Sequence, residues 1–174
     1  MTITIPDSVV ARGKFSAQLI ATLTTPGAPK LSEMTAAQEM TCFFPEDWEG
    51  VSADQNVNTQ TRMCIAEEWD VLGNVKRSIS DVTYTYLPQG LISLAGNKLY
   101  SLLVPGSSMY VMLKYGIAPG TANAIGDKYD VIGITVGARS KKPTGTDESA
   151  PLVVTQKLAL NRALGYYEDV AMVA

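Results

Sequence analysis

The chain has 174 residues, of which 18% are charged and 46% hydrophobic, and its formal net charge is −3. This length is typical of one domain, and the hydrophobic content excludes disorder of the whole chain, which needs low hydrophobicity and high charge. No stretch approaches the ~18 consecutive apolar residues of a membrane span. The first residues have neither the basic nor the apolar region of a secretory signal. We therefore expect a single domain over residues 1–174, with no membrane partner.

Several residue types and motifs that carry chemistry are missing. The sequence contains no histidine, which is the commonest general base and metal ligand. Cys42 and Cys64 lie too far apart for a zinc or redox motif; we expect two small side chains on strands, or else a disulfide between neighbouring strands. The segment 120–128 has the wrong spacing for a phosphate loop, with Asp127 in place of the lysine, and is expected to be a turn that enters a strand. The sequence predicts no enzyme activity, no metal and no cofactor.

Most segments alternate apolar and polar residues with the period of two that is typical of strands. The expected strands are 17–23, 82–86, 109–115, 129–136, 152–160 and, closing the chain, 170–173. One segment, near 94–104, instead has apolar residues spaced as one stripe of a helix, with Ser93 before it and Pro105 after it. A lone helix among strands is expected to cover an open side of the sheet. The predicted fold class is mainly β, a β-sandwich or half-barrel with one α-helix.

Two polar stretches without clear periodicity, near 45–60 and 139–151, are expected to be long loops. The first contains Trp48 among acidic and polar residues. Because a large aromatic side chain in such a loop is commonly buried at an interface, we expect Trp48 to anchor this loop on a neighbouring subunit. The alternative is that Trp48 folds back on its own domain.

Opposite charges concentrate in these two stretches. Glu46 and Asp47 lie in the first, and Arg139, Lys141 and Lys142 begin the second. One interpretation is that each cluster is simply solvated. The other is that the two clusters meet head-to-tail across a subunit interface, where complementary charges set the register.

Several segments resemble major tail tube proteins of long-tailed phages, in particular those of actinobacterial hosts. In chain order these segments are 31–44, 59–64, 69–74, 81–86, 96–106, 110–115, 126–137 and 156–173. The chain departs from that pattern where the early hairpin usually turns on a glycine, since it has Ala36-Ala37-Gln38 there. The resemblance is one of residue order and spacing, without a catalytic signature.

The resemblance implies a structural virion protein of the phage tail, assembled in the host cytoplasm. It implies stacked, six-membered rings in which strands of neighbouring subunits join into one barrel around a lumen for the genome. The implied partners are other copies of the chain and the tape-measure, tail-tip and tail-terminator proteins, with DNA only in transit. Another virion role (head decoration or head–tail joining) and a small-molecule-binding β-barrel are the alternatives.

A lumen that conducts DNA works best with few cations facing inward, because DNA binds proteins mainly through phosphate contacts to Lys and Arg. We therefore expect small or neutral polar side chains there, with Thr83, Thr85 and Thr135 as candidates.

Overall fold

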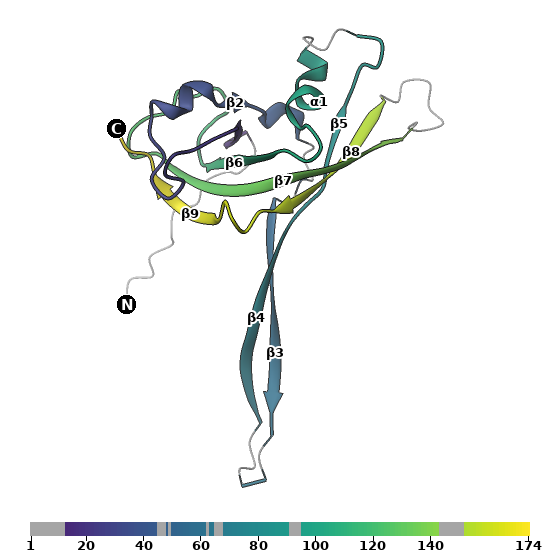
Figure 1. The fold of residues 1–174 in the computed structure, drawn as a ribbon. Helices are drawn as coiled ribbons and strands as arrows, with labels where there is room; N and C mark the ends of the chain where they lie inside the picture. Colours follow the sequence, from purple (N-terminus) through teal and green to yellow (C-terminus); the bar gives the residue numbers. More distant parts are fainter. Residues whose placement is uncertain are drawn as a thin grey trace, which may run out of the picture.

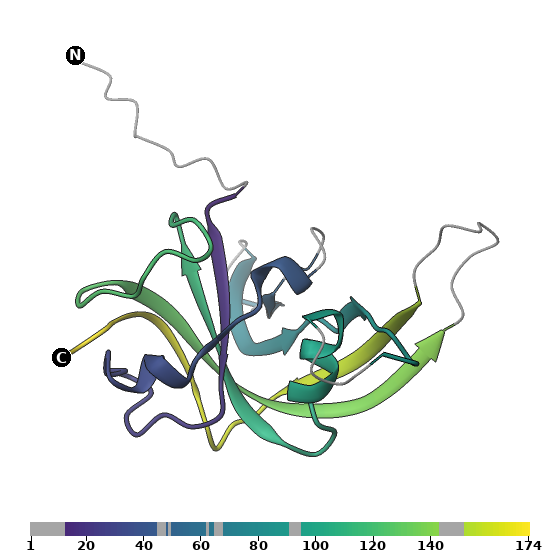
Figure 2. The same cartoon turned by 90° about the horizontal axis from the view of Figure 1, so that it is seen from above.

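The main element of the computed structural model is a curled, seven-stranded antiparallel sheet. The structure describes residues 13–44, 48, 50–61, 63–64, 68–90, 95–142 and 152–174. In spatial order the strands are β2 (Gln38–Glu39), β1 (Phe15–Ile20), β6 (Ser108–Tyr115), β7 (Lys128–Lys142), β8 (Val153–Leu160) and β5 (Val82–Thr85), and β9 (Tyr166–Ala171) pairs with β7. The sheet forms a half-barrel (Figures 1 and 2). The predicted fold class, mainly β with a half-barrel, is confirmed.

A second sheet has only two strands, β3 (Val51–Gln60) and β4 (Trp69–Ile79), which we call the arm. The arm projects from the rest of the molecule, which we call the head (Figure 1). The expectation of a loop near 45–60 is therefore wrong for residues 51–60, and residues 45–47 and 49 lie outside the described part. Ladder hydrogen bonds satisfy the backbone of a strand whatever its side chains, and β3 is exposed along almost its whole length. A strand that buries neither face needs no apolar alternation.

The expectation of a loop near 139–151 is also wrong for residues 139–142. Strand β7 continues to Lys142, because Arg139 to Lys142 pair with Gln156 to Val153 of β8. A register shift between Val136 and Arg139 precedes this pairing. Residues 143–151 lie outside the described residues.

The helix expected near 94–104 is present but shorter. A 3-10 turn, η3 (Ala95–Asn97), leads into α1 (Lys98–Leu102). Pro105 explains the end, because the residue before a proline is pushed out of the helical region. Leu99 and Leu103 are buried against the sheet, so α1 covers one side of the half-barrel (Figure 1). Two further 3-10 turns, η1 (Glu33–Ala36) and η2 (Thr41–Phe43), flank β2.

The cysteines are not on strands as expected. Cys42 lies in η2 and Cys64 lies in the connection between β3 and β4. Both are exposed free thiols, so the alternative of a disulfide is not realised either.

The sheet is buried on both faces at one end and on only one face at the other. In β6, for example, Val111 belongs to a core on the α1 side, while Tyr110 and Met112 belong to a second core on the opposite face. In β5 and β8, by contrast, buried residues such as Val82 and Val154 all face the first core. The other face of β5 and β8 is therefore left uncovered.

Candidate functional site

The uncovered sheet face is lined with hydroxyl side chains, and we call it the hydroxyl face. Paired residues of antiparallel strands share a face, and alternate residues of one strand point the same way. By this register Thr83, Thr85, Thr155, Thr135 and Ser108 lie on the hydroxyl face, together with Ser140, Lys142, Val153, Lys157 and Ala159. The Thr83 and Thr155 Oγ1 atoms are 3.1 Å apart, and the Thr135 Oγ1 and Ser108 Oγ atoms are 3.4 Å apart. The structure thus brings the three predicted threonines onto one surface.

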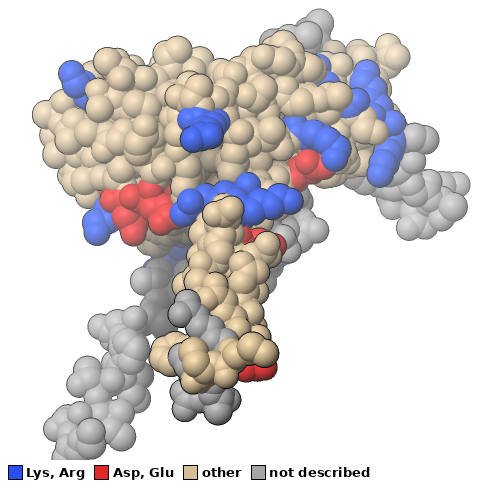
Figure 3. All heavy atoms as spheres, turned by 60° about the horizontal axis from the view of Figure 1, so that its bottom comes forward, with Lys and Arg blue, Asp and Glu red and all other residues tan. Residues whose placement is uncertain are grey.

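The hydroxyl face also carries cations, which the sequence analysis did not place there. Lys157 lies on it, in the same alternation as Thr155, and its Nζ is 3.7 Å from Asp81 Oδ2. Arg77, at the base of the arm, lies 3.6 Å from Glu168. Figure 3 shows basic side chains around the base of the arm with acidic ones among them. Such exposed pairs add little stability, about 0–1 kcal/mol each, but they place a carboxylate beside each of these two cations.

Strand β5 ends the path of the sheet and, among the described residues, pairs only with β8. The Tyr86 N–H donates to Leu152 O at 3.1 Å. Because hydrogen-bonded pairs alternate in an antiparallel ladder, Val82 and Tyr84 bond to β8, and the backbone N–H and C=O groups of Thr83 and Thr85 point away from it. An exposed edge of this kind is a template for pairing with another strand.

The three basic residues at the end of β7 lie in different surroundings. The Arg139 guanidinium donates to the carbonyl oxygens of Tyr100 and Leu103 at 2.5 and 2.6 Å and lies 3.9 Å from the Tyr100 ring centroid. It therefore satisfies carbonyls at the C-terminal end of α1. The Lys141 Nζ donates to Tyr86 Oη at 3.0 Å, and this hydrogen bond raises the pKa of Lys141. Lys142 is exposed and pairs with Val153, which places it on the hydroxyl face.

Trp48 packs against its own chain. Its ring lies 4.5 Å from that of Phe44, and its indole N–H donates to Ser80 O at 3.4 Å. The ring also contacts the core on the α1 side. This is the folded-back alternative, so the expectation that Trp48 anchors a loop on a neighbour has no support from its surroundings. Glu46 and Asp47, the acidic members of the predicted interface, lie outside the described residues.

The arm carries large exposed apolar side chains that the sequence analysis missed. Their exposed fractions are 67% for Leu72, 60% for Trp69, 55% for Val57, 47% for Val75 and 43% for Val71. The signal available in the sequence was that Val51, Ala53 and Val57 all lie at alternate positions of 51–57, interrupted by Gln55. By the register of β3 and β4, Val57, Leu72 and Val75 lie on one face of the arm, and Trp69 and Val71 lie on the other.

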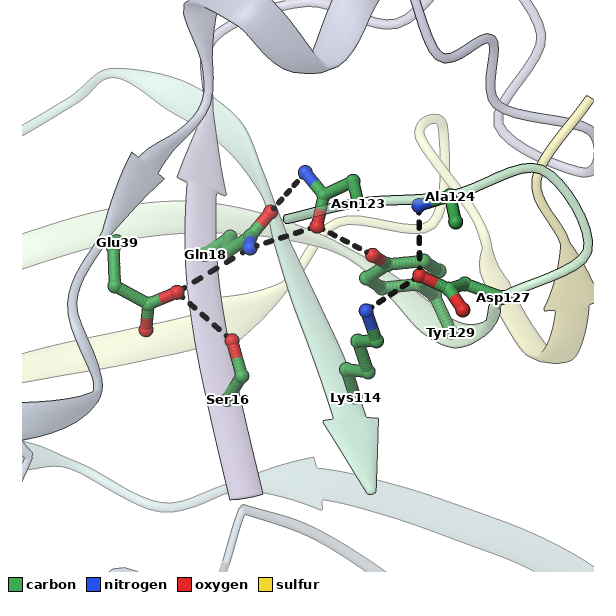
Figure 4. Close-up of polar contacts among 8 residues, drawn as sticks. All are labelled: Ser16, Gln18, Glu39, Lys114, Asn123, Ala124, Asp127 and Tyr129. Atoms are coloured by element: carbon green, nitrogen blue, oxygen red, sulfur yellow. Dashed lines mark hydrogen bonds and ion pairs between the residues drawn. The ribbon is translucent and has the colours of Figure 1, made fainter. Parts of the chain in front are cut away.

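A polar cluster lies on the second face of the sheet (Figure 4). The Glu39 carboxylate accepts hydrogen bonds from Ser16 Oγ and Gln18 Nε2 at 2.9 and 3.3 Å. The Gln18 and Asn123 amides bond to each other, and the Tyr129 hydroxyl donates to Asn123 Oδ1 at 2.7 Å. These groups satisfy one another, which indicates a structural role.

The same region holds a buried ion pair. Lys114, whose side chain is 2% exposed, donates to Asp127 Oδ2 at 2.5 Å, and the Ala124 N–H donates to the same oxygen at 2.9 Å. Burial, with the nearby carboxylates of Asp127 and Glu39, raises the pKa of Tyr129 well above its ordinary value. The pair fastens the turn at 124–127, which enters β7 as the sequence predicted, onto β6.

No helix in the described part of the chain is long and apolar enough to cross a membrane. Within the same residues, His, Cys, Asp and Glu side chains form no group that could hold a metal ion.

A family model for the phage tail tube protein matches residues 2–166. The chain belongs to this family. It is therefore a structural protein of the virion tail and not an enzyme, as the sequence predicted.

A solved structure has a similar fold. The chain is similar to one from the "Cryo-EM structure of the anti-feeding prophage (AFP) baseplate, 6-fold symmetrised", with a TM-score of 0.52 and 9% sequence identity. The match covers 91% of this chain and 94% of the other. At this identity the likeness concerns the fold alone. No curated protein sequence matches the chain.

Proposed function

We propose that this tail tube protein polymerises as stacked rings of six subunits and that the hydroxyl face lines a lumen through which DNA leaves the virion. The observation that carries the proposal is the uncovered, mostly uncharged sheet face next to an open strand edge. Membership of the tail tube family supports self-assembly. The solved structure of similar fold was reconstructed with six-fold symmetry, which supports the number of subunits.

The open edge of β5 supports joining between subunits. Closing a ring pairs edge strands that otherwise invite aggregation. Thr83 and Thr85 supply the free backbone donors and acceptors for a neighbour's strand. The sheets of all subunits then continue into one barrel, with the hydroxyl faces on the same side.

The chemistry of the hydroxyl face supports a conduit for DNA. Threonine and serine side chains are short and neutral, so they offer phosphates no counter-charge. Of the cations near this surface, Lys157 and Arg77 each lie beside a carboxylate of the same chain, which weakens their attraction for a passing phosphate. Lys142 also lies on the hydroxyl face, at the far end of β7, and we propose that it pairs with Glu46 or Asp47 of a subunit in the next ring, in head-to-tail stacking.

The remaining parts of the proposal follow from the sequence resemblance. The tube belongs to a long-tailed phage of an actinobacterial host and assembles in the host cytoplasm. It meets the tape-measure, tail-tip and tail-terminator proteins, and DNA only in transit.

The experiment begins with electron microscopy of the concentrated wild-type protein, which is expected to show tubes of stacked rings. Thr85→Lys is then compared with Thr85→Gln, a neutral side chain of similar length. Both are expected to form tubes, but phage carrying Thr85→Lys ejects DNA more slowly, most clearly at low salt, because the new cation adds a salt-dependent phosphate contact. Equal ejection by both variants contradicts the lumen assignment, and closed single rings or trimers contradict the tube.

A further inference from the structure

The edge strand β5 is held at its end by the turn that leads into α1. Asn97 is the last residue of η3 and is 2% exposed. Its amide oxygen accepts the Leu87 N–H at 2.9 Å, and its amide nitrogen donates to Leu87 O at 3.0 Å. The Asn97 side chain thus gives the backbone of Leu87, two residues beyond β5, the two hydrogen bonds that a neighbouring strand would supply.

A second contact joins α1 to the end of β5. The ring of Tyr86, which follows β5 directly, stacks on the Tyr100 ring of α1, with centroids 4.8 Å apart and ring planes at 20°. The Lys141 ammonium lies 4.8 Å from the Tyr86 centroid and 5.4 Å from the Tyr100 centroid. Stacked rings, and a cation over a ring, attract each other beyond the area that they bury. The Tyr86 side chain is therefore fixed on the helix.

The helix is in turn fixed to β7 and β8, beside the end of β5 (Figure 1). Arg139 of β7 donates to the last carbonyl oxygens of α1, as described above. Gln156 of β8 is fully buried, donates to Leu103 O at 3.0 Å and accepts the Tyr84 hydroxyl at 2.8 Å. Residues 95–103, which we call the clamp, therefore connect the end of β5 to two other strands of the sheet.

The position of β5 gives this connection its importance. The strand has 4 residues and, among the described residues, pairs with β8 alone. A short strand that is bonded on one side opens locally at a low free energy, because few contacts hold it. The outward backbone groups of Thr83 and Thr85 can pair with a further strand only while β5 stays extended in line with the sheet.

We propose that the clamp, through Asn97 and Tyr100, holds β5 in place in the unassembled subunit and so presents its outer edge for joining to a neighbour. The proposal rests on the proposed function, in which β5 pairs with a strand of the neighbouring subunit. Ordering a binding segment in advance lowers the entropy that is lost on association, so the clamp speeds joining. Arg139 and Lys141 then act as positioning residues within one subunit, in contrast to the head-to-tail interpretation of the sequence.

Hydrogen exchange of the dilute, unassembled protein, followed by mass spectrometry, measures how firmly β5 is held. Tyr100→Ala removes the ring stack, and Asn97→Ala removes both hydrogen bonds to Leu87. Each is expected to speed exchange of the amides in 82–87 about ten-fold, while the amides of β6 keep their wild-type rates. The matched controls are Tyr100→Phe, which keeps the ring, and Tyr115→Ala, which removes an exposed tyrosine at the end of β6. Both controls are expected to exchange in 82–87 like the wild type.

Tube growth, followed by light scattering after the protein is concentrated, measures the effect on joining. Tyr100→Ala and Asn97→Ala are expected to slow growth about ten-fold, because β5 spends less time in the conformation that pairs. Tyr100→Phe and Tyr115→Ala are expected to grow tubes at the wild-type rate.

Each other outcome overturns the proposal. Unchanged exchange in 82–87 means that the clamp does not hold β5, and faster exchange in β6 as well means that residues 95–103 only support the core. An equal effect of Tyr100→Phe and Tyr100→Ala means that the stack is not responsible. Faster exchange with normal tube growth means that the order of β5 does not limit joining. Failure of the wild-type protein to form tubes refutes the proposed function, whereas the exchange experiment needs no tubes and still decides whether the clamp holds β5.

Discussion

The buried pair of Lys114 and Asp127 yields a prediction that can be worked from the structure. Asp127→Asn keeps the size of the side chain and an oxygen to accept the Ala124 N–H, but it removes the charge opposite the Lys114 ammonium. Breaking a buried pair in this way costs about 3–5 kcal/mol. Because the Asp127 side chain is 18% exposed, we expect the lower end, about 3 kcal/mol. For a chain of this size that lowers the melting temperature by about 10 °C.

The stability that the Asp127 carboxylate contributes depends on pH in a defined direction. Burial alone raises the pKa of Asp127, but hydrogen bonds from Lys114 and the Ala124 N–H, together with the Lys114 charge, outweigh it and hold the pKa below its ordinary value of 3.8. A lowered pKa in the folded state contributes stability that is present above the unfolded value and is lost as the pH falls through the folded value. The wild-type advantage is therefore expected to be constant near neutral pH and to shrink below about pH 3.8.

Urea unfolding of wild type and Asp127→Asn, followed by circular dichroism between pH 3 and 7, measures both the loss of unfolding free energy and its dependence on pH. The double variant Lys114→Met, Asp127→Asn serves as control and is expected to regain most of the loss, since replacing both charges leaves no unpaired ion. A loss below about 1 kcal/mol near neutral pH, or a double variant no better than the single one, would refute the reasoning.

Three further predictions concern the core, a close backbone approach and the stacking charges. Trp48→Ala is expected to lower the unfolding free energy of the monomer by about 2 kcal/mol, less than for a fully buried aromatic. Unchanged monomer stability together with lost assembly would instead show that Trp48 contacts a neighbouring subunit. Gly133→Ala puts a Cβ 2.2 Å from the Leu164 Cβ and is expected to cost about 3 kcal/mol in a urea titration, whereas a neutral result would mean that the 161–165 turn moves freely. Lys142→Glu is expected to slow tube growth in light scattering most at low salt, where screening is weakest, and Glu46→Lys to restore it; a defect independent of salt speaks against head-to-tail charge pairing.

The strands of the main sheet could be predicted because they are rich in β-branched and aromatic residues and because the buried residues of β8 alternate with less buried ones. Segments 109–115 and 129–136 correspond to β6 and β7, and 152–160 corresponds to β8. What the sequence did not show is that β1 and β6 are buried on both faces. Gln18 and Lys114 are buried because Asn123 and Asp127 satisfy them, and such pairing between distant residues cannot be read from one sequence.

The arm was missed for a different reason. Its strands bury almost nothing within the chain, so selection for a core leaves no strong alternation in them. A β-bulge opposite Asn56, where the pairing shifts between Gln55 and Val57, also breaks the period of two in β4, which hides Leu72 and Val75 as members of one face. For the candidate site, the three threonines were found because short polar residues alternated with apolar ones, whereas the position of Lys157 among them depends on the register of β8.

The most direct test of the central claim is a cryo-EM reconstruction of tubes grown from the purified protein. Each ring is expected to contain six subunits, with β5 paired with a strand of the neighbouring subunit and with Thr83, Thr135 and Thr155 facing the lumen. Tubes in which the hydroxyl face is turned outward or covered by protein would contradict the lumen assignment.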